Sequence, residues 1–283
     1  YRNGKIDNYE ISMQGGNDKT TFYLSGNYNK QDASLINIDF SRLSSKFNIN
    51  HKINKKISVE AGINLSNTQQ RGPYGGADGT TAFGAAQYSA PILLPFNPIY
   101  NASGVFFGMP GSAESIVGDL NHNVIASSSY IRRSGSTKQL VGNLTLNYDI
   151  HKNLKFRVMG GLDYRLLKTS FYGDPRLQDY FGVKGSLTEA NNENLNLSTN
   201  ATLNYNKSFN EIHNVGVLLG AEYREEVNEG TSFNAQGFPS PEFYTGNAAA
   251  EPSSIGGFWS SFRRAGTFAN VRYDFKSKYL LNF

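Results

Sequence analysis

The side chains most capable of catalysis are sparse in this chain of 283 residues. Its four histidines are His51, His122, His151 and His213. Three of them lie beside short predicted turns, no two have metal-ligand spacing on one strand face, and the absence of cysteine removes thiolate zinc sites and catalytic thiols. No G-x-S-x-G elbow follows a strand, and neither Gly75-Gly76 nor Gly256-Gly257 precedes a helix that could hold a phosphate. We therefore expect no enzyme activity, no cofactor and no metal site.

Binding is better supported, because aromatic residues gather with Asn, Ser and Gly in segments that lack strand periodicity. Exposed rings supply stacking faces and their polar neighbours supply hydrogen bonds, which suits a sugar or a peptide. The candidate aromatics for contact with substrate or partner are Tyr74, Phe96, Phe106, Phe107, Phe238, Phe243, Tyr244, Phe258 and Trp259. The same rings could instead only pack these segments against one another. The apolar stretch 91–107 favours contact with a protein, since large exposed apolar patches usually mark partners.

The elements that position these segments are β-strands. Every odd position from Ile57 to Leu65 is apolar, and the even positions from Leu140 to Ile150 repeat the pattern, whereas a helix would need apolar residues at i, i+3, i+4 and i+7. Strands are predicted at about 8–16, 20–31, 40–53, 57–67, 138–150, 154–168, 194–206, 213–226, 262–275 and 278–283. Lengths of ~10–14 residues exceed the ~5–6 of an ordinary soluble strand. They suit tilted strands that cross a bilayer.

The connections between these strands alternate between short and long. Short turns are predicted near 15–19, 54–56, 151–153, 207–212 and 276–278, and long segments near 32–39, 68–137, 169–193 and 227–261. An outer-membrane barrel has this arrangement, with tight periplasmic turns and long extracellular loops. The aromatic residues close to the short turns are then predicted to form a periplasmic girdle, although Tyr and Phe are also simply good strand residues. They are Tyr148, Tyr205, Phe209, Tyr273, Phe275 and Tyr279.

Composition agrees with this class. A mean hydropathy of −0.45 and the lack of any run near 18 apolar residues exclude a helical membrane protein. A net charge of +4 is weak evidence for a nucleic-acid partner. The predicted fold is all-β, an antiparallel transmembrane barrel segment of about ten strands that contacts outer-membrane lipids. Its polar strand faces, rich in Asn, Ser and Thr, would line a hydrated lumen.

Four stretches resemble a known family. Residues 14–28 resemble a hairpin of SusC/RagA-type TonB-dependent outer-membrane transporters, and residues 40–50, 213–222 and 268–281 are similar to three further strands of that family in the same order. The resemblance implies that residues 1–283 are the middle part of a barrel of about 22 strands. It also implies that the plug and the C-terminal strands lie outside this sequence.

The same resemblance implies a function. It implies TonB-dependent uptake of oligosaccharides or oligopeptides across the outer membrane of a Gram-negative bacterium. A SusD-like lipoprotein would cover the long loops, and a TonB-type energy coupler would act on the plug. Two alternatives remain: a structural or secretion-associated barrel that serves as a docking platform, and a closed ten-stranded barrel, enzymatic or adhesive. The short strand that ends at Phe283 favours a fragment over closure, because about six residues do not span a bilayer.

Overall fold

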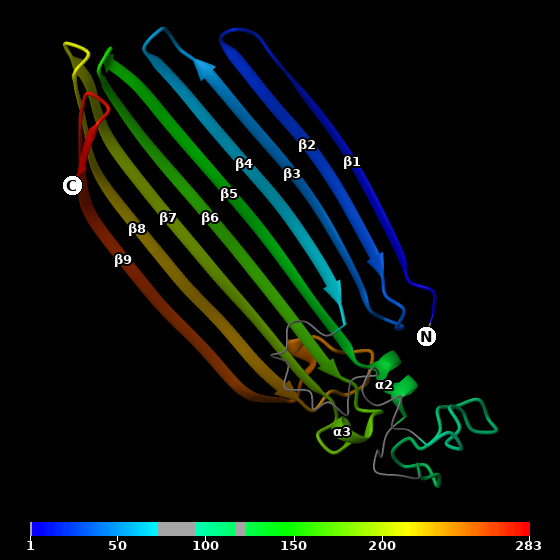
Figure 1. Ribbon diagram of the computed structural model, residues 1–283. Helices are drawn as coiled ribbons and strands as arrows, with labels where there is room; N and C mark the ends of the chain where they lie inside the picture. The colour runs from blue at the N-terminus through cyan, green and yellow to red at the C-terminus, as the bar shows by residue number, and fades with distance from the viewer. Residues whose placement is uncertain (1, 73–93, 117–122) are drawn as a thin grey trace.

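The chain folds into one antiparallel sheet whose ten strands follow one another in sequence order (Figure 1). The computed structural model describes residues 2–72, 94–116 and 123–283, so Tyr74, residues 91–93 and His122 lie outside the described part. The strands are β1 Lys5–Gly16, β2 Thr20–Asp32, β3 Asp39–Lys52, β4 Ile57–Arg71, β5 Arg132–His151, β6 Leu154–Gly173, β7 Ser186–Phe209, β8 His213–Gln236, β9 Glu251–Phe275 and β10 Tyr279–Asn282. The predicted all-β fold is confirmed.

Short helical segments occur only in the long connections of the described chain. They are α2 Val124–Tyr130, α3 Gln178–Phe181 and the 3₁₀ turn η3 Gly246–Ala248. Among the residues described, none of the helices is long and apolar enough to cross a membrane.

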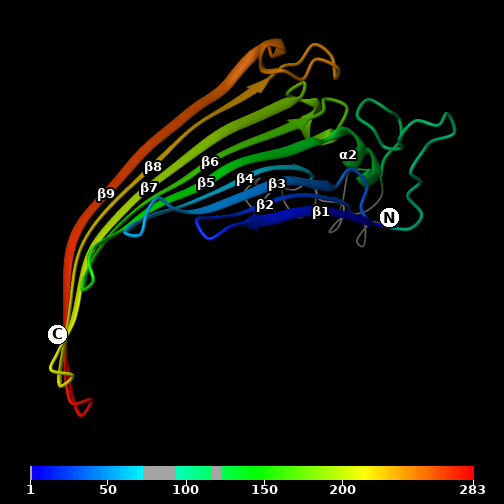
Figure 2. The ribbon, with the colours of Figure 1, turned by 90° about the horizontal axis from the view of Figure 1, so that it is seen from above.

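The sheet is open and curved. Each strand pairs with its sequence neighbours, and among the described residues β1 pairs with β2 alone and β10 with β9 alone. Figure 2 shows the resulting bent wall, with the two edge strands far apart. The alternative of a closed ten-stranded barrel is therefore wrong for this structure, because closure would need pairing between β1 and β10.

The five short turns lie at one end of the sheet and the long connections at the other (Figure 1). In each of the first two turns a side-chain oxygen accepts backbone hydrogen bonds: Oδ1 of Asn17 accepts from Lys19 and Thr20, and Oδ1 of Asn54 accepts from Lys56 and Ile57. Two other turns, at 210–211 and 276–277, have positive φ at both central residues. That conformation matches the right-handed twist of a hairpin.

The strands are longer than the sequence periodicity predicts, and the long segments are correspondingly shorter. The connection predicted at 169–193 shrinks to 174–185, and the one predicted at 227–261 shrinks to 237–250. The connection predicted at 68–137 runs from 72 to 131 and contains α2. The outer halves of β7, β8 and β9 lack clear alternation, so sequence periodicity does not predict them as strands.

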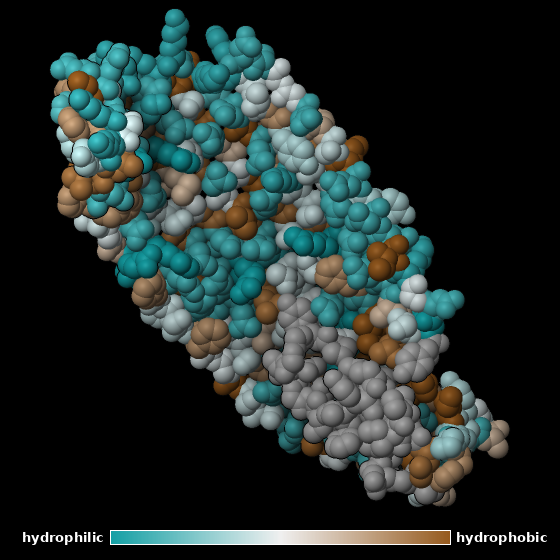
Figure 3. All heavy atoms as spheres, in the orientation of Figure 1, coloured by the Kyte–Doolittle hydropathy of each residue, from teal (hydrophilic) through white to brown (hydrophobic). Residues whose placement is uncertain are grey.

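The cross-strand register sorts the side chains onto two faces. Leu144 of β5 pairs with Ala61 of β4 and with Gly160 of β6, which in turn faces Thr199 of β7, so the alternating positions of successive strands share one side. This apolar face is exposed: 44% of Ile63, 58% of Leu144 and 48% of Leu219 are accessible. The opposite face carries the polar set, and the side of the sheet turned to the viewer in Figure 3 is largely hydrophilic.

Candidate functional site

The polar face of β7 and β8 carries a chain of hydrogen-bonded amides. The amide nitrogen of Asn196 donates to Oδ1 of Asn194 at 2.6 Å, and Asn194 donates to Asn228 on the neighbouring strand. Asn228 donates in turn to Glu226 at 3.0 Å, which also accepts from Arg224 at 3.3 Å. Each amide both donates and accepts, so this wall presents both kinds of group to an uncharged polar solute.

Some of the charges on the polar face lie beside a polar or charged partner. Arg264 lies 3.3 Å from Glu222, and Gln139 donates to Asp163 at 3.0 Å. Among the predicted contact residues, Phe258 of β9 shares this face, because it pairs with Gly230 of β8, which pairs in turn with Asn192 of β7. The sequence signal for this wall is asparagine at six of the eight even positions from 192 to 206, which alternate with the apolar set. The predicted polar strand face is therefore present in the structure as a connected network of side chains, and its place along a hydrated lumen stays a prediction.

The apolar face is bordered at its outer end by tyrosines and ion pairs. Tyr223 of β8 donates to Glu225 at 3.0 Å, and Arg263 of β9 lies 2.7 Å from the same carboxylate. His213 lies at the short-turn end of β8, ten residues from Tyr223. At a rise of ~3.3 Å per residue, the two residues are ~33 Å apart along the strand. At a tilt of ~40° this corresponds to a band ~25 Å tall, the height of the lipid-facing belt of an outer-membrane barrel.

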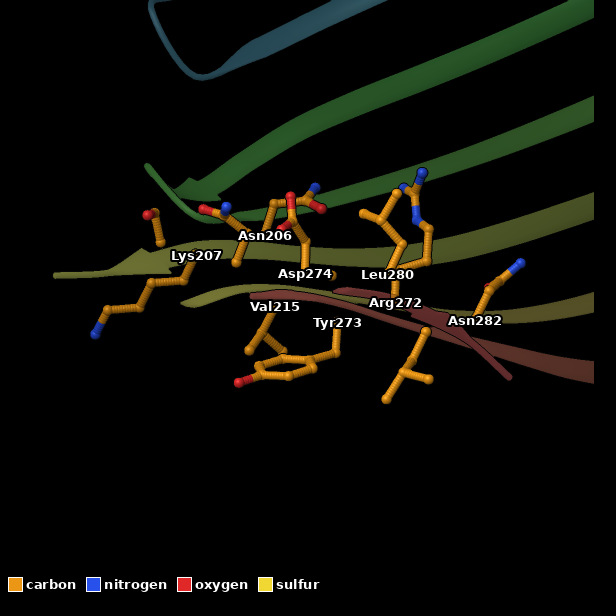
Figure 4. A pocket seen from close by; sticks show the side chains of 12 residues that line it. Asn206, Lys207, Val215, Arg272, Tyr273, Asp274, Leu280 and Asn282 are labelled. Carbon is orange, nitrogen blue, oxygen red and sulfur yellow. The ribbon is translucent and has the colours of Figure 1, made fainter. Parts of the chain in front are cut away.

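The six predicted girdle residues all lie at the short-turn end and share the apolar face. His213 stacks on Tyr273 with ring centres 6.0 Å apart, and Phe275 contacts both His213 and Tyr279. Figure 4 shows the alternation at this end, where Asn206, Arg272 and Asp274 point to one side of the strands and Lys207, Val215 and Tyr273 to the other. Their position at a membrane boundary remains a prediction, and the shared face is consistent with it.

The outer end of the sheet contains a small buried core. Tyr172, Leu187 and Phe238 are 1%, 1% and 4% exposed, and Phe233 with Ala248 and Ala249 packs against them. The rings of Tyr172 and Phe238 meet edge to face at 5.2 Å. The prediction that Phe238 presents its ring to a solute is corrected here, because the ring is buried under the connection 237–250 and fixes that connection to the sheet.

Arginines stack on aromatic rings around this core. Arg132 lies 4.0 Å from the ring centre of Tyr244, and Arg176 lies 3.8 Å from that of Tyr130. Arg176 also binds the fully buried Asp174 through two hydrogen bonds of 2.9 and 2.7 Å, and the bond raises the pKa of the guanidinium further. In the connection 237–250, a hydrogen bond from the Ser240 hydroxyl lowers the pKa of the Glu242 carboxyl. These contacts join the outer ends of the strands to the connections between them.

The connection 94–131 carries exposed apolar side chains on an ordered base. Asn123 caps α2 and donates to the carbonyl oxygens of Ile99 and Phe107 at 2.8 and 3.2 Å, which attaches the loop to the helix. Phe106 stacks on Tyr100 at 5.0 Å. Phe96 is 64% exposed. This projecting segment is the turquoise loop of Figure 1.

The remaining predicted contact aromatics differ in their placement. Phe243 and Tyr244 are 60% and 40% exposed in the connection 237–250. Phe258 and Trp259 were expected in a loop, and this is corrected: both lie within β9, on opposite faces of the strand. Strand residues project to alternate sides, so these two rings cannot serve the same surface.

Two of the three histidines in the described chain hydrogen-bond to hydroxyl groups. His51 lies 2.7 Å from the Thr20 hydroxyl, and His213 lies 2.7 Å from that of Tyr273. Across the described residues, no three of the side chains His, Cys, Asp and Glu are grouped to hold a metal ion.

The fold and its two faces define a class: a wall segment of an outer-membrane β-barrel with long connections at one end. The chain is 27% identical over 297 residues to TonB-dependent receptor P3 of Formosa agariphila, a match to all of this chain and 28% of that receptor. TonB-dependent receptor P26 of the same organism is 22% identical over 98% of this chain and 27% of its own length. No family model matches.

Solved structures show the same fold. The RagAB peptide transporter aligns with a TM-score of 0.75 at 19% identity, over 98% of this chain and 31% of that one. The siderophore receptor PiuA from Acinetobacter baumannii aligns with a TM-score of 0.55 at 10% identity, over 98% of this chain and 39% of its own. The resemblance to SusC/RagA-type TonB-dependent receptors that four sequence stretches predicted is confirmed, and the chain spans about a quarter of the length of its curated relatives.

Proposed function

We propose that the chain forms part of the barrel wall of a TonB-dependent importer in the outer membrane of a Gram-negative bacterium. The observation that carries this is the sheet with an exposed apolar face, a hydrogen-bonded polar face and all long connections at one end. An exposed apolar face of this extent needs lipid to cover it. Similar proteins bear the names of TonB-dependent receptors and of a peptide transporter, which supports the same function.

The proposed solute is an oligosaccharide or an oligopeptide. Both are rich in uncharged donors and acceptors, and the amide chain from Asn194 to Asn228 offers matching groups on the polar wall. A SusD-like surface lipoprotein is the proposed lid over the long connections, as the resemblance to SusC/RagA-type receptors implies and the similar fold of the RagAB peptide transporter supports. The TonB-type energy coupler would act outside the part of the receptor that this chain represents.

The test is energised uptake by cells that carry the full-length receptor. We expect labelled oligosaccharides or oligopeptides to enter only with an intact proton gradient. The double substitution Asn194→Leu with Asn228→Leu should raise the solute concentration for half-maximal uptake about fivefold, as loss of ~1 kcal/mol of hydrogen bonding would. The matched control is Asn191→Leu with Thr231→Leu, a cross-strand pair on the other face of the same two strands, and it should leave uptake unchanged.

The second candidate is a docking platform that binds a protein partner without importing solute. The exposed apolar side chains of the connection 94–107 favour it. A wild-type receptor that retains a stoichiometric partner yet shows no energised uptake of any solute in either class would establish this candidate and contradict import.

A further inference from the structure

Basic residues are distributed unevenly between the two ends of the sheet. The five short-turn segments 17–20, 51–57, 149–155, 207–213 and 274–279 hold nine of the 15 lysines, none of the 12 arginines and four carboxylates. The rest of the chain holds 18 basic and 19 acidic residues. We call the nine side chains the lysine collar: Lys19, Lys52, Lys55, Lys56, Lys152, Lys155, Lys207, Lys276 and Lys278. The net positive charge of the chain is therefore concentrated at the short-turn end.

The collar is exposed and largely free of ion pairs. All nine side chains are solvent-exposed, and among the residues that the structure describes Lys155 is the one collar lysine within ion-pair distance of a carboxylate, 3.6 Å from Asp149. Cations at the outer end of the apolar face behave differently, since Lys5 lies 2.8 Å from Asp7 and Arg263 lies 2.7 Å from Glu225. Carboxylates pair with the cations at the outer end, whereas the short-turn segments hold few carboxylates for their lysines. The collar charges therefore remain available to anions from outside the chain.

Three collar lysines also mark the depth at which such anions would lie. The ammonium groups of Lys207, Lys276 and Lys278 stand 4.4, 5.5 and 5.7 Å from the ring centres of Phe209, Phe275 and Tyr279. All three rings belong to the apolar face at its short-turn border. Aromatic rings and long cationic side chains share the headgroup level of a bilayer, with the stem in apolar surroundings and the charge in the polar layer.

We propose that the lysine collar binds the headgroups of anionic phospholipids in the leaflet that surrounds the short turns. The phosphate is the complementary group, and Lys supplies a compact charge on a flexible stem that can follow a mobile lipid. Contact of the ammonium groups with rings of the apolar face favours a lipid over a soluble acidic protein, which would approach beyond the membrane surface. The inference rests on the membrane orientation in the proposed function.

The experiment uses the full-length receptor, purified in detergent and mixed with equal amounts of phosphatidylglycerol and phosphatidylethanolamine. Native mass spectrometry counts the lipids retained. The test variant carries Lys→Gln at 52, 55, 56, 276 and 278, and the control carries Lys→Gln at 5, 30, 138, 168 and 184, which removes the same charge elsewhere. We expect wild type and control to prefer phosphatidylglycerol at least threefold and the test variant to lose that preference, as electrostatic recognition of anionic lipid requires.

A further variant with Lys→Arg at the same five collar positions keeps the charge and should keep the preference. Heat-modifiable gel mobility reports whether each barrel is folded, and the smaller Lys55→Gln, Lys56→Gln variant replaces the test variant if that one fails to assemble. Equal retention of both lipids by wild type overturns the proposal, as does equal loss in test and control variants. No solute is present in this experiment, so a negative lipid result does not contradict the proposed import. A negative uptake result, in turn, does not change how the lipid count is interpreted.

Discussion

The guanidinium of Arg132 lies 4.0 Å from the ring centre of Tyr244. Arg132 opens β5, and Tyr244 belongs to the connection between β8 and β9, so the contact joins parts of the chain that are far apart in sequence. The Tyr244 ring also lies 5.8 Å from that of Tyr172 in the buried core. The outer end of the wall is thus organised by its own contacts, and the aromatics proposed to meet solute or partner lie on an ordered base.

This contact predicts a difference between two substitutions of Tyr244. Tyr244→Phe keeps the ring face that attracts the cation, whereas Tyr244→Ala removes it and should weaken docking of the connection 237–250 by ~0.5–1 kcal/mol, as for an exposed cation–π pair. Limited proteolysis of the folded receptor measures this, with faster cleavage of the connection in the alanine variant alone. Equal cleavage rates in both variants would show that the ring does not hold the connection.

A buried and an exposed phenylalanine of the same connection should behave in opposite ways. Phe238→Ala removes a side chain that is 4% exposed and should destabilise local packing by ~3–5 kcal/mol. Phe243→Ala removes a ring that is 60% exposed and should leave packing intact. Amide hydrogen exchange across residues 237–250 distinguishes the two. The prediction fails if exchange in Phe238→Ala matches the wild type or if Phe243→Ala accelerates it to the same degree.

Neighbouring residues on the two faces of β4 offer a test of the membrane orientation. Ile63 lies on the apolar face and Asn64 on the polar face, and both are exposed. Ile63→Arg places a charge in the lipid belt and should cost ~2–4 kcal/mol of folding stability, whereas Asn64→Arg should cost little. Urea unfolding of the full-length receptor in lipid vesicles measures both. Equal destabilisation would contradict the assignment of the apolar face to lipid.

The projecting loop should bind the partner through its apolar side chains. Phe96 and Val105 are 64% and 55% exposed, and Phe96→Asp with Val105→Asp would bury charges in any apolar interface there. We expect the proposed lipoprotein to co-purify at under about a tenth of the wild-type amount, since loss of a buried apolar anchor typically costs over 1.4 kcal/mol. The control Ala102→Asp with Ser103→Asp changes exposed positions of the same loop, and stoichiometric recovery with the first pair would place the interface elsewhere.

Much of the fold follows directly from the sequence. Alternation with period two assigns Ile63 and Asn64 to opposite faces, as the structure confirms, because consecutive side chains of a strand project to opposite sides. The positions of the five short turns and the gathering of Tyr148 and Tyr273 at the short-turn end were predicted in the same way. The apolar–polar period of a strand and the residue types of a turn depend only on neighbouring residues, so they can be predicted from one sequence.

The outer end of the wall was decided by tertiary structure. Residues 251–261 form half of β9 although both their faces are polar or mixed, because hydrogen bonds to β8 extend the strand where no bilayer imposes a pattern. Phe238 and Phe243 are five residues apart in one connection, yet one is buried and the other exposed. Nothing local distinguishes them: burial of Phe238 depends on Tyr172 and Leu187, which reach it from other strands.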